Sequence, residues 1–160
     1  MRYWFYRLGA ETGLRAGELR VLRVADLDCK KGRLVVPAAY SKRRREDVID
    51  WLGQDTLYEL AMFVLGMEPE RPILRLCHPC TVTKVLRFDL GRAGIAYRTE
   101  AGLFDFHALR HTFVTLAVGA CGNLRDAQHV ARLSTPALLA RYAHPDLPHI
   151  REAMRGMPTF

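Results

Sequence analysis

Residues 12–22, TGLRAGELRVL, decide the fold. The Thr-Gly pair that opens this stretch is a helix stop signal, since glycine commonly follows the last helical residue. Residues 2–11 repeat large apolar side chains at helical spacing, and residues 16–23 do so again over a shorter span. The sequence therefore predicts two helices separated by a break. Arg15 lies just after that break, and Glu18 is close enough along the chain to orient it.

The remaining pattern predicts an α+β domain that is mostly helical with one small antiparallel sheet. Residues 33–36 are apolar and β-branched, and residues 46–51 alternate as a return strand. Residues 97–103 predict a loop or a short hairpin. The tip between the two strands of the sheet is strongly basic and contains Lys42, Arg43, Arg44 and Arg45.

Helix signals recur through the second half of the chain. Thr81, Asp105 and Thr135 are expected N-caps, because short polar side chains accept hydrogen bonds from the first free N–H groups of a helix. Pro136 follows the third cap, at the position where proline is best tolerated, and begins a helix that carries Tyr142. The expected helices cover residues 54–65, 81–93, 106–118, 124–132, 136–144 and 146–155.

Composition limits the possible classes of protein. The chain has 160 residues, of which 49% are apolar, as expected for one globular domain. No apolar stretch approaches the roughly 20 residues that a membrane-spanning helix needs. Residues 1–6 are too aromatic, and too short as an apolar stretch, for a signal peptide, so we expect a cytoplasmic protein. The net charge of +7 suits a polyanionic partner.

Four cysteines occur, at positions 29, 77, 80 and 121. In a cytoplasmic protein we expect them to be reduced. Cys77 and Cys80 have a spacing typical of metal ligands, with His78 between them, but no second pair follows at zinc-finger distance. We therefore expect thiols in a loop, with neither a metal nor a cofactor. A zinc-bound regulatory module is the alternative.

Several residues match the needs of metal-free strand breakage in DNA. The phosphate gains negative charge in the transition state, so fixed cations must meet it. A nucleophile must attack, and the leaving oxygen must receive a proton. The candidates are Arg15 at the helix break, Lys42 at the hairpin tip, His107 and Arg110 three apart on one helical face, and Tyr142 near the end of the chain.

Three stretches together resemble the sequence boxes of the tyrosine recombinase (phage integrase) family. TGLRAGELRVL at residues 12–22 is similar to the first-arginine box, and HALRHTF at residues 107–113 is similar to the His-x-x-Arg box. AQHVARLSTPALLARYAHPD at residues 127–146 is similar to the terminal box, which is written around Leu-Gly-His and a later Tyr. The boxes occur in the family's order. The resemblance implies the DNA breaking-rejoining fold of the family's catalytic domain, with double-stranded DNA as substrate.

The same resemblance implies a role for each candidate. Arg15 and Arg110 would bind the non-bridging phosphate oxygens, and Lys42 would protonate the leaving 5′ oxygen. His107 would assist proton transfer at the nucleophile, and Tyr142 would attack and form a 3′-phosphotyrosyl link. No cofactor is implied. Further DNA contacts are expected from Arg43, Arg44, Arg45 and Arg141.

Simpler roles remain open for these residues. Arg15 is suited to satisfying carbonyls at a helix C-terminus. Any of the basic residues 42–45 is placed to reach the phosphate. His111 lies one residue off the face of His107 and is expected to be structural. Tyr142 taken alone would be a packing residue, and only the presence of the other candidate residues favours its role as a nucleophile.

Two features depart from the family pattern. The family's second histidine, sometimes a tryptophan, falls at Leu133, which cannot donate a hydrogen bond. His129, one helical turn earlier, is the alternative donor, and losing one phosphate donor can slow the reaction by ~10²–10³. The chain also begins at the helix leading into Arg15. We therefore expect residues 1–160 to be a single catalytic domain, truncated at its N-terminus and without the family's DNA-clamping domain.

The sequence leaves several functions open. The first is an integrase, resolvase or mobile-element recombinase that cuts and rejoins DNA. The second is a catalytically impaired DNA-binding remnant of such an enzyme. A type IB-like topoisomerase and the zinc-bound module complete the set. For a recombinase we expect a tetramer on DNA and a monomer when free.

Overall fold

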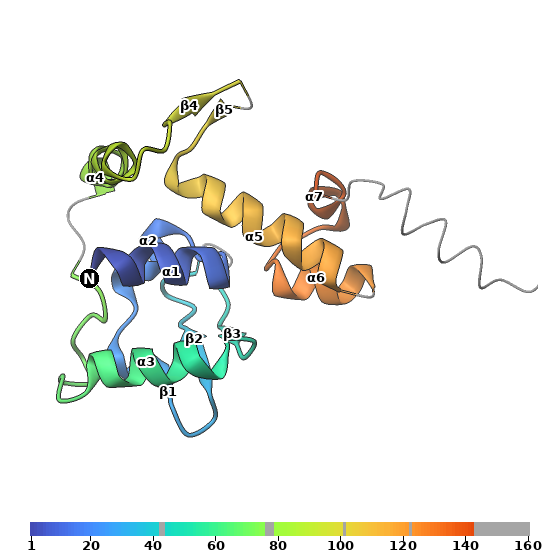
Figure 1. Ribbon diagram of the computed structural model, residues 1–160. Coiled ribbons are helices and arrows are strands. Elements are labelled where there is room, and N and C mark those ends of the chain that lie inside the picture. The colour runs from blue at the N-terminus through green and yellow to red at the C-terminus, as the bar shows by residue number, and fades with distance from the viewer. Residues whose placement is uncertain (42–43, 76–78, 101, 122, 143–160) are drawn as a thin grey trace, which may run out of the picture.

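The computed structural model describes residues 1–41, 44–75, 79–100, 102–121 and 123–142. Helices dominate, and two small antiparallel sheets accompany them (Figure 1), so the expected α+β class is confirmed. No described helix is long and apolar enough to cross a membrane. The helices are α1 (Arg2–Thr12), α2 (Ala16–Val21), α3 (Gln54–Val64), α4 (Pro79–Arg92), α5 (Phe106–Ala120), α6 (Leu124–Val130) and α7 (Pro136–Ala140), with a 3₁₀ turn at Val24–Asp26.

The larger sheet has the order β1-β2-β3 and is antiparallel throughout. Strands β2 (Arg33–Val36) and β3 (Asp47–Ile49) form the predicted hairpin, with Leu34 opposite Ile49. Strand β1 (Leu27–Asp28) was not predicted, because two residues are too few to show an alternating pattern. A second pair, β4 (Arg98–Thr99) with β5 (Gly102–Leu103), confirms the short-hairpin alternative.

Several helix boundaries differ from the expected ones by one or more residues. Helix α4 begins at Pro79, so the predicted cap Thr81 lies inside it; proline is well tolerated in a first turn. Helix α6 ends at Val130, two residues early. Helix α7 ends at Ala140, and Tyr142 lies in the turn after it, where its N–H donates to the Leu139 carbonyl three residues back. The expected helix at residues 146–155 lies outside the described residues.

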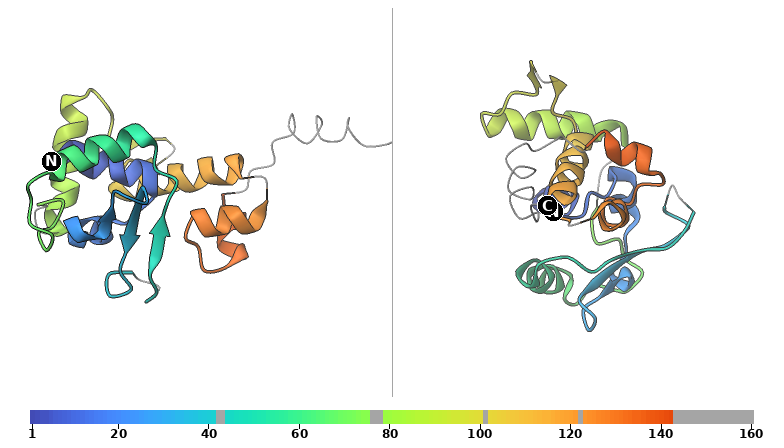
Figure 2. Two further views of the ribbon diagram at one scale, coloured as in Figure 1. Left: turned by 90° about the horizontal axis from the view of Figure 1, so that it is seen from below. Right: turned by 90° about the vertical axis from the view of Figure 1, so that its right-hand side faces the viewer.

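Two apolar clusters share helix α5. The larger cluster joins α1, α2, the three-stranded sheet, α3 and α4, and reaches α5 at Phe106. The smaller one lies at the other end of α5, and the left view of Figure 2 shows α6 and α7 beside that end of the helix. The middle of α5 therefore lies where the two clusters meet. The buried residues of the smaller cluster are Phe113, Val114, Ala127, Ala131, Leu133 and Leu139.

Two glycines let α1 pack closely on α5. A Cβ atom at Gly9 would lie 2.7 Å from the Phe106 ring, and one at Gly13 would overlap the Phe113 ring. Gly13 also has φ +62°, a left-handed conformation that ends α1 and that glycine adopts without steric cost. The Thr-Gly stop signal is thus confirmed, and its glycine sets the distance between the two helices.

Candidate phosphate-binding site

Arg15 is placed by the break between α1 and α2. It is the N-cap residue of α2, and the Glu18 carboxylate accepts from both the Arg15 backbone N–H (2.9 Å) and its guanidinium (3.2 Å). Upstream, the Thr12 hydroxyl accepts from the Leu14 N–H, which fixes the turn. Glu18 therefore orients Arg15, as the spacing predicted. A third of the Arg15 side chain remains exposed (34%).

Helix α5 brings His107 and Arg110 to the same place. Asp105 caps this helix as predicted, accepting from the Ala108 N–H at 3.0 Å. Arg15, His107 and Arg110 all line one hollow of about 260 Å³ between α2, α4 and α5. Two arginines 95 positions apart in the sequence thus share one basic concavity with a histidine.

Arg110 is held by main-chain carbonyls. Its guanidinium donates to Gly13 O at 2.5 Å and to Ala131 O at 3.0 Å, so it joins the α1–α2 break to the segment after α6. Burial, and after it the charges of Arg15 and Arg132, lower the pKa of Arg110 to about 10, while the charges of Glu18 and Tyr142 oppose this shift. At neutral pH the side chain remains a cation.

Three rings lie in succession beside Arg110. The His107 ring meets His111 edge-on, with 4.7 Å between centroids, and His111 lies 5.4 Å from the Tyr142 ring. Partial burial lowers the pKa of His107, as do the charges of His111 and Arg110, so His107 is mostly neutral at pH 7. A neutral imidazole accepts a proton. Tyr142 is half-buried against the smaller cluster, near enough for its ionised form to act on Arg110.

Arg132 is a charged residue of this region that sequence reasoning missed. It is 3% exposed, and its guanidinium bridges two buried carboxylates, Glu18 on α2 and Asp47 on β3. Burial alone would raise the pKa of Glu18, but the charge of Arg132 and hydrogen bonds from Arg15 and Arg132 hold it below its ordinary value. The one sequence signal was Arg132 itself, standing where the terminal box has the glycine of Leu-Gly-His.

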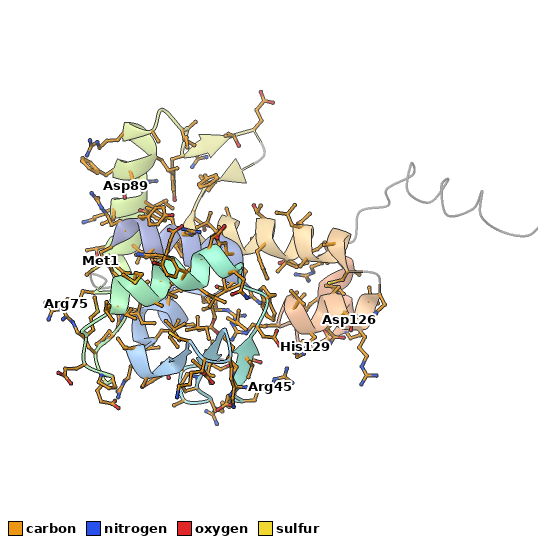
Figure 3. All side chains as sticks on the ribbon, turned by 60° about the horizontal axis from the view of Figure 1, so that its bottom comes forward. Met1, Arg45, Arg75, Asp89, Asp126 and His129 are labelled. Carbon is orange, nitrogen blue, oxygen red and sulfur yellow. The ribbon has the colours of Figure 1, made fainter. Side chains whose placement is uncertain are left out.

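The basic hairpin tip is described in part. Lys42 and Arg43 lie outside the described residues, so their predicted roles stay predictions. Arg44 and Arg45 are exposed, and Arg45 Nε donates to Asp47 at 3.2 Å. Figure 3 shows Arg45 beside the sheet.

The residues expected near the missing second histidine differ in their surroundings. Leu133 is buried in the smaller cluster, so the side chain at this position points into apolar surroundings. His129, labelled in Figure 3, is exposed on α6 and does not line the hollow around Arg15 and Arg110. Arg141 is the C-cap residue of α7 and is exposed.

No group of histidine, cysteine or acidic side chains suited to a metal occurs among the residues that the structure describes. Cys77 and His78 lie outside those residues, and so does the side chain of Cys80. Cys29 and Cys121 are free thiols.

The chain belongs to the phage integrase family, whose sequence model matches residues 2–149. Tyrosine recombinase XerC of Proteus mirabilis is 30% identical over 156 residues, covering 87% of this chain and 46% of that protein. A Sinorhizobium fredii protein named as an integrase/recombinase, y4rF, is 26% identical over 88% of this chain and 35% of its own length. The chain therefore spans less than half the length of these relatives.

Solved structures show the same fold. The crystal structure of XerA recombinase matches 96% of this chain and 57% of its own, with a TM-score of 0.68 and 22% identity. The Tn1549 transposon integrase in complex with circular intermediate DNA matches equally well (TM-score 0.68, 17% identity, 96% of this chain and 57% of that one). The expected fold, that of a tyrosine recombinase catalytic domain, is confirmed.

Proposed function

We propose that this domain cuts and rejoins DNA at specific sites through a 3′-phosphotyrosyl intermediate formed by Tyr142. The observation that carries the proposal is the shared hollow of Arg15, His107 and Arg110, with Tyr142 close to Arg110. Double-stranded DNA is the proposed substrate, and a tetramer on DNA the proposed assembly. The Tn1549 integrase and XerH recombinase structures in complex with DNA support this choice of partner.

The proposed reaction divides among the residues as follows. Arg15 and Arg110 bind the non-bridging oxygens of the scissile phosphate and offset the charge that grows in the transition state. His107, mostly neutral, accepts the phenolic proton as the Tyr142 oxygen attacks phosphorus. The bond from phosphorus to the 5′ oxygen breaks, and Lys42 donates a proton to that oxygen. Reversal by a 5′ hydroxyl reseals the strand and frees Tyr142.

The preorganisation of the two arginines supports these roles. Each guanidinium is already fixed by protein acceptors, Arg15 by Glu18 and Arg110 by two carbonyls, so little rearrangement is needed when a phosphate arrives. Two of the Arg110 N–H groups are used in this way, and the others have no partner among the described residues. Bidentate contact with a phosphate suits such a planar donor.

The experiment is a covalent trapping assay. A nicked duplex that releases a short 5′-hydroxyl fragment on cleavage should trap wild-type protein on DNA as an SDS-stable band. Tyr142→Phe should remove the band, because no phenolic oxygen remains to attack. Tyr58→Phe, an exposed tyrosine on α3, is the matched control and should keep it. A band that survives Tyr142→Phe, or is absent from wild type, contradicts the proposal.

One observation favours a second candidate, a DNA-binding remnant with impaired catalysis. Leu133 is buried and apolar at the position of the family's second donor, so one contact to the phosphate is missing. Wild-type protein that gives no covalent band but retards duplex DNA at low salt, with affinity falling steeply as salt rises, would support this candidate. Relaxation of supercoiled plasmid by monomeric protein would indicate a type IB-like topoisomerase.

A further inference from the structure

We infer that Arg132 is a positioning residue of this phosphate site, acting through Glu18 on Arg15 and through Asp47 on the base of the basic hairpin. The inference rests on the proposed function of the site. It does not make Arg132 a phosphate ligand, because the residue is 3% exposed and four of its five N–H groups already donate to Glu18 and Asp47.

The backbone at Arg132 favours glycine. Helix α6 ends in a Schellman motif: the Arg132 N–H donates to His129 O (2.9 Å) and the Leu133 N–H to Gln128 O (3.1 Å). Arg132 itself has φ +53°, a left-handed backbone conformation that residues other than glycine rarely adopt. A branched or long side chain at this position is unfavourable unless its own contacts compensate.

The guanidinium of Arg132 makes those contacts. Nη1 and Nη2 donate to the two oxygens of Glu18 at 3.0 and 3.3 Å, a bidentate pair. Nε and Nη2 donate to one oxygen of Asp47 at 3.1 and 2.8 Å. All three side chains are at least nine-tenths buried. One fixed cation therefore separates two carboxylates that would otherwise repel each other.

Glu18 links this cation to Arg15. Its carboxylate accepts from Arg132 on one side and from Arg15 on the other, so Arg132 determines where the oxygens that hold Arg15 lie. The charged groups that act on Glu18 come from four elements: Arg15 before α2, Arg132 after α6, Arg110 on α5, and Asp47 on β3 through the shared guanidinium. The charge of Arg132 is the strongest of the influences that lower the pKa of Glu18.

Asp47 extends the network to the hairpin. It is the first residue of β3, and its carboxylate also accepts from the Ser41 hydroxyl (3.3 Å) and Arg45 Nε (3.2 Å). Ser41 precedes the tip of the hairpin, and Arg45 is the last residue of the tip. Arg132 thus ties the segment leading to Tyr142 both to the base of that tip and to the helix that begins at Arg15.

The test compares cleavage rates and the Glu18 pKa in Arg132→Gly and Arg132→Lys. Glycine adopts the left-handed backbone conformation without strain and removes the guanidinium. Lysine keeps the positive charge but lacks the planar group that donates to two oxygens at once. Arg132→Gly should form the covalent adduct roughly 10- to 100-fold more slowly, the usual effect of removing a residue that orients a ligand group. Arg92→Gln, an exposed arginine at the end of α4, is the charge-matched control and should keep the wild-type rate.

The pH profile separates positioning from structural support. In Arg132→Gly the pKa of Glu18 should rise, so adduct formation should fall at a higher pH than in wild type as Glu18 becomes protonated. Arg132→Lys should keep the wild-type midpoint of this pH profile, because the lysine charge remains beside Glu18. In a Glu18→Gln background, Arg132→Gly should have a smaller further effect, because only the ion pair with Asp47 remains to be lost. An equal loss at every pH, or one that persists undiminished in Glu18→Gln, would mean that Arg132 only stabilises the fold and would overturn the inference.

Two measurements keep the result decisive. If Arg132→Gly does not fold, the double variant Arg132→Gly/Asp47→Asn is used instead, because it lacks the buried Asp47 charge that the glycine would leave unpaired. Its reference is Asp47→Asn alone. A ¹³C NMR titration of the Glu18 carboxyl reads the same coupling without cleavage. No adduct in wild type, with a raised Glu18 pKa in the variant, contradicts the proposed function alone. An adduct in wild type with an unchanged Glu18 pKa in the variant contradicts the role of Arg132.

Discussion

His107 and Arg110 share one helix, and burial lowers the pKa of both side chains with different consequences. Arg110, with a pKa of about 10, stays protonated at neutral pH. His107 has its pKa below the ordinary 6.5 and is mostly neutral. Helix α5 therefore presents a permanent cation and a proton acceptor to the same hollow, a combination that phosphoryl transfer by a tyrosine needs.

His111 tunes this acceptor. Its charge is the second largest influence that lowers the pKa of His107, after burial. His111→Gln should therefore raise the pKa of His107 toward its ordinary value, and the acid limb of adduct formation should move to higher pH. An NMR titration of the His107 ring checks the pKa directly. His129→Gln, a change on α6, should leave that titration unmoved, and an unmoved His107 in His111→Gln would contradict the coupling.

At the scale of elements, the seam between α1 and α5 sets the position of Arg110. Gly9 and Gly13 lie one helical turn apart and face Phe106 and Phe113, which flank Arg110 on α5. Without side chains on α1 here, the Gly13 carbonyl comes within 2.5 Å of the Arg110 guanidinium. The close contact between α1 and α5 therefore also anchors Arg110, the proposed phosphate ligand.

Gly13→Ala should destabilise the domain and impair the site. The left-handed backbone costs a non-glycine residue about 1–3 kcal/mol, and the added methyl group must displace the buried Phe113 ring. Gly91→Ala is the matched control, since Gly91 lies in α4 with open space around its Cβ position; it should stabilise by about 0.5–1 kcal/mol. Urea unfolding measures both. Equal stability of the two variants would show that the seam tolerates a Cβ atom.

The sequence predicted the elements better than the contacts between them. Asp105, Thr135 and the Thr-Gly break act locally, so their roles were readable from neighbours in the chain. Arg132 was missed because its partners lie 85 and 114 positions away, and no local pattern reports such distances. Tyr142 was placed on a helix because α7 ends without a glycine or proline stop signal.

At the scale of the whole molecule, buried polar groups join the two clusters where the site lies, in addition to Trp51, which packs against both. Glu18 and Asp47 come from the larger cluster's elements, while Arg132 follows α6 in the smaller one. Arg110 makes a parallel link from α5 to Gly13 and Ala131. Breaking a buried pair by removing one partner costs about 3–5 kcal/mol, so this junction also affects stability.

Acid should weaken the junction. The pKa of Glu18 in the folded domain lies below its ordinary 4.5, so its contribution to stability is complete above that value and is lost as pH falls through the lower folded value. Wild type should exceed Glu18→Gln in free energy of unfolding at pH 7, and the difference should shrink below about pH 4.5. Urea unfolding across this range measures it. A difference that does not change with pH would show that Glu18 is not ionised in the folded domain.

The division into two clusters also separates the proposed nucleophile from the groups proposed to bind the phosphate. Tyr142 is anchored to the smaller cluster through Leu139 and its neighbours, while Arg15 and His107 depend on the larger one. A displacement of α6 and α7 as a unit would carry the phenol away, and it would also break the contacts of Arg110 with Ala131 and of Arg132 with Glu18 and Asp47. Delivery of the tyrosine and assembly of the two arginines are therefore expected to occur together, because Arg110 and Arg132 link them.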